Sequence, residues 1–415
     1  MDTILAKRCD ELTLAISRMK TLSSHDALIL LKASFSAPKV LHILRSSPCE
    51  GHSSLSTFDS LQRSGLSQIT NSNLSDIQWL QASLPVKDGG LGIRRVASLA
   101  SSAFLASAAS TLTLQDLVLS RCGSCPDTAV PASSSRWSVA NNLPCPSLPL
   151  CTSQQAWDRP CIDADKALIL SAAPDQHHRA RVLAVSAPHA GDWLYALPIS
   201  NCGLRLDDEA IRVAVGLRLG VNLCEPHPCP CGVQVDARGI HGLACRQSSG
   251  RTARHHHLND VIWRALSRAS IPSSKEPSGL SRSDGKRPDG MTLIPWQGGK
   301  SLLWDVTVAD TLAASHLPIT SRQPGAAAEN ASDRKEAKYA ELARVHIFMP
   351  LAFETLGPIG VKASEFLSEL GRRISSVTSD PREVSYLFQR ISVAIQRFNG
   401  VCFRGSFITP PDTES

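Results

Sequence analysis

Hydrophobic residues recur with a helical period along the first part of the chain. Those from Leu5 to Met19 fall on one face of a first helix, and a second apolar face begins near His25. The stretch 98–110 is rich in Ala and Ser, which favours a helix that packs closely against its neighbours. We therefore expect a helical region over 1–120.

The residue pattern in the middle of the chain changes twice, first to a Ser/Pro/Cys-rich segment and then to a helical pattern. Residues 121–165 are rich in Ser, Pro and Cys, which is typical of a linker or a loose loop. A helical connector is expected over 166–223. Its strongest element is the segment 208–220, which starts with acidic residues and stops at Gly220.

From Leu258 onward the pattern alternates between helical and extended segments. The expected order is helix, strand, strand, helix, strand, helix, helix, which describes a mixed α/β domain over 258–415. The helices are expected at 258–269, 331–345, 361–376 and 382–398, and the strands at 292–296, 301–308 and 345–357.

Composition indicates the kind of cellular compartment in which the protein resides. No window of about 18 uninterrupted apolar residues occurs, and the N-terminus lacks a basic start followed by an apolar run, so we expect neither a membrane span nor secretion. The 13 cysteines are an odd number, which favours a reducing compartment and metal binding over disulfides. A net charge of +6 permits binding to a polyanion.

The segment 224–257 concentrates ligands for a transition metal. Two thiols in a compact loop, closed by a His and a further Cys, suit tetrahedral zinc. These residues are Cys229, Cys231, His241 and Cys245. The C-x-C spacing is shorter than the usual roughly two to four intervening residues, so Cys224 or His227 is an alternative ligand. The competing interpretation is a Cys-rich loop without metal.

A basic flank follows this loop in the stretch GRTARHHHLND, residues 250–260. Arg251 and Arg254 beside a zinc loop suit contact with phosphate, although a solvated basic face explains them equally well. Three consecutive histidines do not share one side of a helix, so we expect no metal cluster from them.

Two aspartates, Asp289 and Asp305, stand in hydrophobic segments on either side of a Gly-Gly turn. A buried carboxylate without a partner costs several kcal/mol, so Asp305 needs a lysine or a divalent cation nearby. A turn centred on the Gly-Gly pair would set Asp305 opposite Thr292 and leave Asp289 about 10 Å away at the rise of a strand. A shared metal site therefore requires a strong twist or a bulge, for which Pro295 is available.

Lys335 and Lys338 follow at helical spacing and share one helix face. A lysine beside the carboxylates would polarise a phosphate or position a water, and Glu276 offers a further acidic ligand. Hard oxygen ligands favour Mg²⁺, with Mn²⁺ as the substitute. Taken alone, the two lysines fit a solvated helix face better. Taken with the aspartates and the zinc loop, they favour a metal site.

Three motifs in order, KRPDG, WDVTV and K-x-x-KY, resemble the PD-(D/E)xK nuclease fold as it occurs in the restriction-like endonuclease of non-LTR retrotransposons. In those elements a Cys-Cys-His-Cys knuckle precedes the nuclease, as CPCG…HGLAC does here. The stretches 25–48 and 79–95 resemble the thumb region that follows a reverse transcriptase palm. The resemblance covers nearly the whole chain.

This resemblance implies a metal-dependent DNA endonuclease that nicks target DNA to prime reverse transcription. Asp289 and Asp305 would be metal ligands, and Lys335 or Lys338 would be the catalytic lysine. Thr307 stands where the commonest form of the fold carries its lysine. Nuclear localisation, with target DNA and element RNA as partners, follows from the same resemblance.

The resemblance also implies that Arg287 contacts DNA or the scissile phosphate. A polymerase palm needs a pair of aspartates in a strand turn, whereas RLDDEA at 205–210 has the pattern of a helix start. We therefore expect no reverse transcriptase activity from this chain. The alternative to an active nuclease is a catalytically inert, nucleic-acid-binding remnant of a degenerate retroelement.

Overall fold

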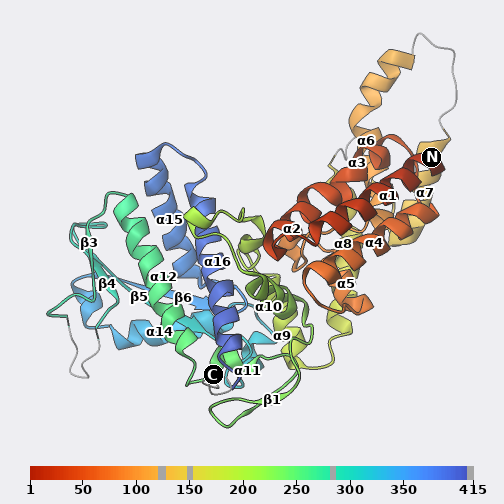
Figure 1. Cartoon of the computed structure of the whole chain (residues 1–415). Coiled ribbons are helices and arrows are strands. Elements are labelled where there is room, and N and C mark those ends of the chain that lie inside the picture. Colours follow the sequence, from red (N-terminus) through yellow and green to blue (C-terminus); the bar gives the residue numbers. More distant parts are fainter. Residues whose placement is uncertain (120–127, 147–152, 281–286, 409–415) are drawn as a thin grey trace. The chain divides into compact units, whose positions relative to one another are not determined.

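The structure is a computed structural model that describes residues 1–119, 128–146, 153–280 and 287–408. The chain divides into two compact units, Met1–Ala172 and Ala173–Ser415 (Figure 1). The first is helical, and the second holds a small Cys/His group and a mixed sheet with helices. The expected combination of α and α/β regions is confirmed at this level.

The described part of the helical unit consists mainly of α-helices. Their bounds are α1 (Asp2–Met19), α2 (Ser24–Leu30), α3 (Ala37–Ser46), α4 (Ser53–Ile69), α5 (Asp76–Ala82), α6 (Val96–Leu119), α7 (Ala129–Asn141) and α8 (Gln154–Ser171). A π-helical stretch at Leu31–Phe35 continues α2, and a 3-10 turn occupies Val86–Asp88. The helices expected from the first apolar face and from 98–110 correspond to α1 and α6.

The Ser/Pro/Cys-rich segment is mostly helical where the structure describes it, so the expectation of a loose loop is wrong for those residues. It forms α7 and much of α8, while 120–127 and 147–152 lie outside the described residues. Trp137 and Trp157 meet edge to face with ring centroids 5.2 Å apart, and Nε1 of Trp137 donates to O of Trp157 at 3.1 Å. Burial of these aromatic rings outweighs the weak helix propensity of Ser and Pro.

Two helical stretches, Ser24–Ser46 and Val96–Leu119, are long and apolar enough to cross a membrane by length and composition alone. Their most apolar windows are 44% and 56% buried within the structure, and core helices of other proteins pass the same test. In α6 the buried Ser102 donates to O of Trp157 at 3.2 Å. This helix therefore makes polar as well as apolar contacts inside the helical unit.

The N-terminus of α6 is capped from a different helix by Asp59 of α4. Oδ1 of Asp59 accepts from N of Val96 at 2.7 Å, and Oδ2 accepts from N of Ala97 at 3.1 Å. The first N–H groups of a helix have no partner within it, so this side chain supplies the missing acceptors. Burial raises the pKa of Asp59 to about 6, while the two backbone hydrogen bonds oppose the shift.

Asp59→Ala is expected to lower the free energy of unfolding of the helical unit by about 2 kcal/mol, because two N–H groups at a buried helix end lose their acceptor. Thermal denaturation of the full chain, followed by circular dichroism, measures this change. Asp10→Ala, which removes an exposed carboxylate from α1, is the matched control. Equal shifts in the two variants would show that the cap contributes nothing.

The second unit is built around a four-stranded sheet in the order β3-β4-β5-β6. The β3–β4 and β4–β5 pairs are antiparallel, and the β5–β6 pair is parallel. The strands are β3 (Ser273–Lys275), β4 (Gly290–Thr292), β5 (Leu302–Ala309) and β6 (Ile347–Glu354), and a separate hairpin pairs β1 (His227–Pro228) with β2 (Gln234–Val235). The strands expected at 301–308 and 345–357 are confirmed as β5 and β6, whereas β3 was not predicted.

Helices cover both faces of this sheet (Figure 1). The helices of the unit are α9 (Gln176–Val185), α10 (Asp208–Leu219), α11 (His241–Ala244), α12 (Ser249–Arg268), α13 (Leu317–Thr320), α14 (Ala326–Lys338), α15 (Val361–Thr378) and α16 (Glu383–Arg404). Trp304 and Val306 of β5 pack with α12, α15 and α16 in one buried cluster. Because side chains alternate along a strand, Asp305 points to the other face, toward α14.

Two helix boundaries differ from the expected ones. Helix α12 begins at Ser249, well before the expected start at 258, so the basic flank is helical. Helix α14 ends at Lys338 instead of near 345, because a 3-10 turn at Leu342–Arg344 leads the chain into β6. The helix start expected in RLDDEA is confirmed, since the side chain of Asp207 caps α10.

The hairpin between β4 and β5 has two registers. At its tip Gln297 pairs with Lys300, as a turn centred on the Gly-Gly pair requires. Along the strands, however, Gly290 pairs with Trp304, so the register expected from the turn does not continue into the sheet.

Extra residues on the β4 side cause this change of register. Leu293–Trp296 lie between β4 and the tip, whereas Ser301 alone lies between the tip and β5. This bulged segment contains Pro295, the residue at which the sequence suggested a bulge. The expected separation of about 10 Å between Asp289 and Asp305 is therefore wrong, because it assumed one continuous ladder.

Candidate metal centres

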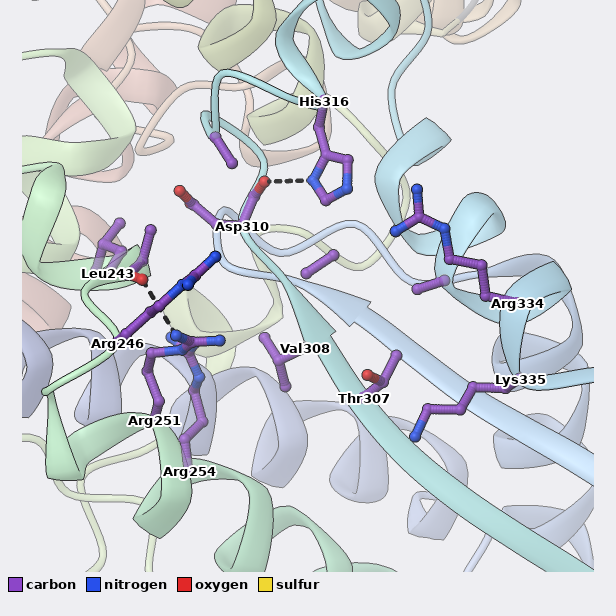
Figure 2. A pocket seen from close by; sticks show the side chains of 14 residues that line it. Leu243, Arg246, Arg251, Arg254, Thr307, Val308, Asp310, His316, Arg334 and Lys335 are labelled. Atoms are coloured by element: carbon purple, nitrogen blue, oxygen red, sulfur yellow. Dashed lines mark hydrogen bonds between the residues drawn. The ribbon is translucent and has the colours of Figure 1, made fainter. Parts of the chain in front are cut away.

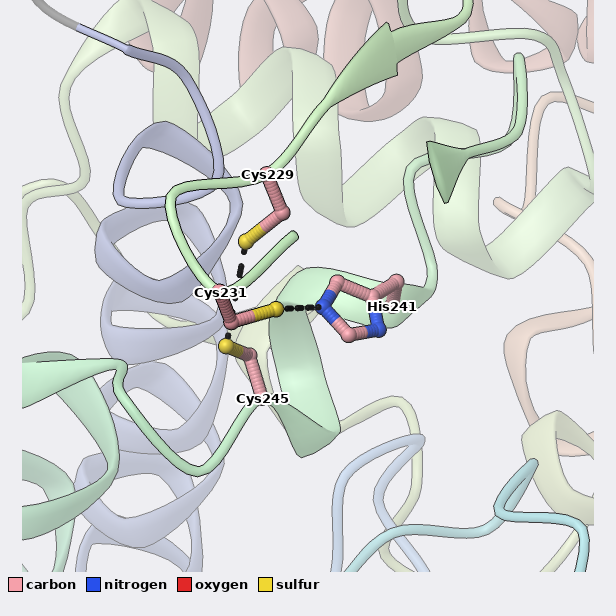
Figure 3. Close-up of side chains that lie close together, drawn as sticks. All are labelled: Cys229, Cys231, His241 and Cys245. Carbon is pink, nitrogen blue, oxygen red and sulfur yellow. Dashed lines mark hydrogen bonds between the residues drawn. The ribbon is translucent and has the colours of Figure 1, made fainter. Parts of the chain in front are cut away.

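Four ligand atoms converge in the Cys/His loop. They belong to Cys229, Cys231, His241 and Cys245, and all lie within 4.8 Å of one another (Figure 3). Sγ of Cys229 is 3.8 Å from Sγ of Cys245, and Sγ of Cys231 is 3.2 Å from Nε2 of His241. With Zn–S bonds of about 2.3 Å, two sulfur atoms of a tetrahedral site lie about 3.8 Å apart. The group could therefore hold a structural zinc ion.

Local structure explains how so short a motif brings four ligands together. The turn after β1 carries Cys229 and Cys231, and N of Gly232 donates to O of Cys229 at 2.8 Å. Gly232 has a φ of 86°, a left-handed conformation that glycine adopts without strain. On the other side, α11 places His241 and Cys245 one helical turn apart, with N of Cys245 donating to O of His241 at 2.9 Å.

The two alternative zinc ligands are engaged outside this group. Sγ of Cys224 lies 3.4 Å from O of Asp236. The ring of His227 stacks on Phe407 with centroids 4.0 Å apart, and its Nε2 lies 3.1 Å from Oγ of Ser406. The candidate ligand set therefore keeps both cysteines of the short C-x-C motif.

The thiols differ in their protonation. Burial raises the pKa of Cys229 to about 11, whereas a hydrogen bond from the backbone of Val233 lowers the pKa of Cys231 to about 7. Zinc binds thiolates, so its binding at neutral pH would release a proton from Cys229.

The loop packs tightly on the end of α16. A Cβ atom on Gly239 would lie 2.3 Å from the ring of Phe403, and one on Gly242 would lie 2.8 Å from O of Cys402. Leu243 shares a buried cluster with Cys402 and Phe403. The last turn of α16 therefore fixes the position of the loop.

The second candidate centre lies where β4 meets β5. Asp289 bonds both neighbours of Asp305: its N–H donates to O of Trp304 at 3.0 Å, and its Oδ2 accepts from N of Val306 at 2.6 Å. The two carboxylates are close enough that the charge of Asp289 raises the pKa of Asp305. The bulged hairpin thus brings together the two aspartates that the sequence singled out.

Asp305 is buried, 3% exposed, and forms an ion pair with Lys335 of α14. Burial and the charge of Asp289 raise the pKa of Asp305, while Lys335 and Tyr339 oppose the shift. Lys335 keeps 24% of its side chain exposed, so its ammonium group bridges a buried carboxylate and an accessible surface.

His255 of α12 joins this site, although the sequence interpretation did not assign it a role. Its Nε2 lies 3.2 Å from Oδ1 of Asp289, and this hydrogen bond raises the pKa of His255. The triplet HHH was the available signal. Three consecutive histidines do not share a helix face, so the triplet predicts no metal cluster, yet a single histidine on the right face reaches Asp289.

The remaining predicted residues have other partners. Nζ of Lys338 donates to the hydroxyl of Tyr339 at 2.7 Å, and that hydroxyl donates to O of Arg287 at 2.9 Å. The side chain of Arg287 forms an ion pair with Glu276, whose own side chain is 53% exposed. The structure therefore brings Lys335, and not Lys338, to Asp305, and it places Glu276 in a separate ion pair.

Arg251 and Arg254 line a groove beside the carboxylates. Figure 2 shows them with Arg246 on one side of β5, while Arg334 and Lys335 of α14 approach from the other. One hollow of this groove has a volume of about 350 Å³. Three arginines from the loop and α12 thus face two cations of α14 across the end of β5.

The chain matches no protein-family model, and no curated protein is significantly similar to it in sequence.

Proposed function

We propose that the second unit is a metal-dependent DNA endonuclease. In this proposal Asp289 and Asp305 hold a magnesium ion, and Lys335 donates a hydrogen bond to the scissile phosphate. One observation carries this proposal. A buried carboxylate lies next to a second carboxylate and pairs with a lysine, and this lysine lines a groove together with several arginines.

The motifs that resemble the PD-(D/E)xK nuclease of non-LTR retrotransposons fall on this site. Asp289 of KRPDG directly precedes β4, Asp305 of WDVTV lies within β5, and Lys335 of K-x-x-KY lies in α14. Thr307, at the position of the usual lysine, is on the same strand face as Asp305, and α14 supplies an ammonium group to that face. These placements support a lysine that has moved from the strand to the helix.

The residues present suit the chemistry of phosphodiester hydrolysis. Carboxylate oxygens are the ligands that Mg²⁺ prefers, and the crowding of negative charge around Asp305 favours a cation there. When bound, Mg²⁺ would activate a water molecule and neutralise charge on the phosphate. Lys335 would donate a hydrogen bond to a phosphate oxygen, and His255 would hold the orientation of Asp289.

The Cys/His loop has a structural role in this proposal. A closed set of four protein ligands leaves no open position for substrate, which is typical of a structural zinc site. We further propose that the chain is the C-terminal part of a retrotransposon protein that acts in the nucleus on target DNA and binds element RNA.

Nicking of a supercoiled plasmid by the full chain tests the proposal. Wild-type protein is expected to nick in Mg²⁺ and not in its absence. Lys335→Met is expected to slow nicking by about 100-fold or more, the usual effect of removing one donor to a charged transition state. Lys338→Met is the matched control and should change the rate by less than about threefold, because Lys338 contacts Tyr339 and not Asp305.

Equal rates for the two lysine variants would contradict the role given to Lys335. The melting temperature of each variant shows whether it is folded under the conditions of the assay.

An inert nucleic-acid-binding protein is the second candidate, and one observation favours it. Both oxygens of Asp289 accept hydrogen bonds within the protein, and Asp305 is already paired with Lys335. Each carboxylate therefore has a partner within the protein in the absence of a metal ion. In this case wild-type protein would bind DNA and would not nick it at any concentration of Mg²⁺.

A further inference from the structure

We propose that the groove beside the carboxylates binds the sugar-phosphate backbone of one DNA strand next to the scissile phosphate, through Arg246, Arg254 and Arg334. This inference rests on the proposed endonuclease function and specifies how the substrate is held.

The groove consists of two adjoining hollows with volumes of about 350 and 380 Å³. These volumes are near the lower end of the range for small-ligand pockets, about 300–1,000 Å³, so each hollow is large enough for part of one strand. Both hollows are lined by Arg246, Arg251, Arg254, Thr307 and Val308. The shared lining makes them one continuous groove.

Positive charge dominates the lining of the first hollow. Five side chains of Arg or Lys face one carboxylate, that of Asp310. Oδ1 of Asp310 accepts from the hydroxyl of Thr355 at 2.8 Å, so this carboxylate is already held within the protein. His316 also lines the groove, and its Nδ1 lies 3.1 Å from the backbone O of Asp310 (Figure 2).

Arg246 and Arg334 are exposed and stand on opposite sides of β5 (Figure 2). Within the part of the chain that the structure describes, neither forms an ion pair. Unpaired guanidinium groups that converge on a narrow groove suit phosphate, which they bind through two parallel hydrogen bonds.

Arg254 gives an independent indication of an anionic ligand. Its side chain is buried, 2% exposed, and its Nη1 donates to Oδ1 of Asn399 at 2.9 Å. Its Nε has no hydrogen-bond partner among the described residues. A buried guanidinium with an unsatisfied donor is costly, and an anion in the groove would offset this cost.

The groove leads directly to the proposed catalytic residues. Lys335 lines the first hollow and pairs with Asp305, while His255 lines the second and contacts Asp289. A strand that lies in the groove would therefore present an adjoining phosphate to the carboxylates.

The Cys/His loop supports one wall of this groove. Arg246 directly follows Cys245, and Leu243 and Ala244 of the same loop also line the first hollow. Occupation of the zinc site would therefore fix the position of Arg246.

Fluorescence anisotropy of a labelled 20-nucleotide single-stranded DNA tests this inference. The full zinc-loaded chain is titrated without added Mg²⁺ over a series of salt concentrations. The double variant Arg246→Gln/Arg334→Gln is compared with Arg372→Gln/Arg382→Gln. The latter removes the same charge from exposed arginines of α15 and of the turn before α16, away from the groove.

The groove variant is expected to bind about tenfold more weakly and to lower the salt-dependence slope by about 1.4, because each phosphate contact contributes about 0.7 for a single strand. The control variant should leave the slope within about 0.3 of wild type. Single-stranded RNA of the same sequence shows whether the groove distinguishes the two backbones. A loss confined to DNA, or one equal for both, supports the groove.

An unchanged slope, or an equal change in the control, would overturn the groove. So would a loss seen for a duplex and not for a single strand. Failure of the endonuclease proposal is separate: wild-type protein would then not nick plasmid, while the groove variant still bound strands more weakly. If the wild type nicks and the slope is unchanged, the groove alone fails.

Discussion

Asp305→Asn is expected to abolish Mg²⁺-dependent nicking and, in the same protein, to raise thermal stability. The nicking rate should fall by at least about 1,000-fold, equivalent to about 4 kcal/mol of activation free energy, because a metal ligand is lost. The gain in stability follows from the raised pKa of Asp305. A carboxylate whose pKa is raised by folding is less stable in the ionised form when folded, so a neutral amide of the same shape removes that cost.

The pH dependence of stability tests the direction of this effect of Asp305. With a folded pKa above the unfolded value, Asp305 contributes stability that is present below the unfolded pKa and is lost as pH rises through the folded pKa. The wild type should therefore lose more stability than Asp305→Asn between acid and neutral pH. Melting temperatures from pH 4 to pH 8 measure this difference.

Asp333→Asn is the control, since Asp333 is an exposed carboxylate on the same helix as Lys335. Mg²⁺ should raise the melting temperature of this control and of the wild type, because a ligand that binds only the folded state stabilises it. It should not raise that of Asp305→Asn. If Asp305→Asn retained nicking, Asp305 would have only a structural role.

Cys245→Ser is expected to remove the bound zinc and to lower the melting temperature of the second unit by about 10 °C. Structural zinc contributes about 10–16 kcal/mol of binding free energy in small domains, and we expect about 4 kcal/mol of stability to be lost here because the rest of the unit has its own core. For a unit of this length, each kcal/mol of unfolding free energy shifts the melting temperature by about 2–4 °C. Zinc content by elemental analysis and differential scanning calorimetry measure the two effects.

Cys224→Ser is the matched control within the same loop. Its sulfur contacts a backbone oxygen and lies outside the group of four, so zinc content should stay at one per chain. Loss of zinc in this variant, or its retention in Cys245→Ser, would contradict the assigned ligands. Chelation of zinc from the wild type should reproduce the effect of Cys245→Ser.

Local sequence predicted the parts of the molecule that depend on local spacing. Amphipathic periods located α10, α15 and α16, and continuous apolar runs located β5 and β6. The group of four ligands in the Cys/His loop is equally local, because a hairpin and one turn of helix bring it together.

The register of the hairpin depended on contacts that the sequence does not display. The hydroxyl of Thr292 accepts from N of Leu302 at 2.9 Å, and N of Leu293 donates to O of Pro272 at 2.8 Å. These bonds replace ladder bonds and hold the bulge against the entry to β3, a strand too short to show a pattern. Turn chemistry alone therefore placed Asp289 too far from Asp305.

The prediction for the segment after residue 128 was wrong for a related reason. Its composition favours a loop, and its helices are held by the contact of Trp137 with Trp157. Such pairings between distant residues decide structure where local propensity is weak. The role of His255 was missed in the same way, since its partner Asp289 comes from another element.

The packing of the Cys/His loop on α16 has a consequence for biosynthesis. Gly239 and Gly242 fit against Phe403 and Cys402 in the last turn of α16, which is synthesised long after the loop. The loop therefore reaches its final position only after α16 has been made. Until then its thiols stay open to oxidation and to competing metals, so the maturation of this protein should depend on the supply of reductant and zinc during translation.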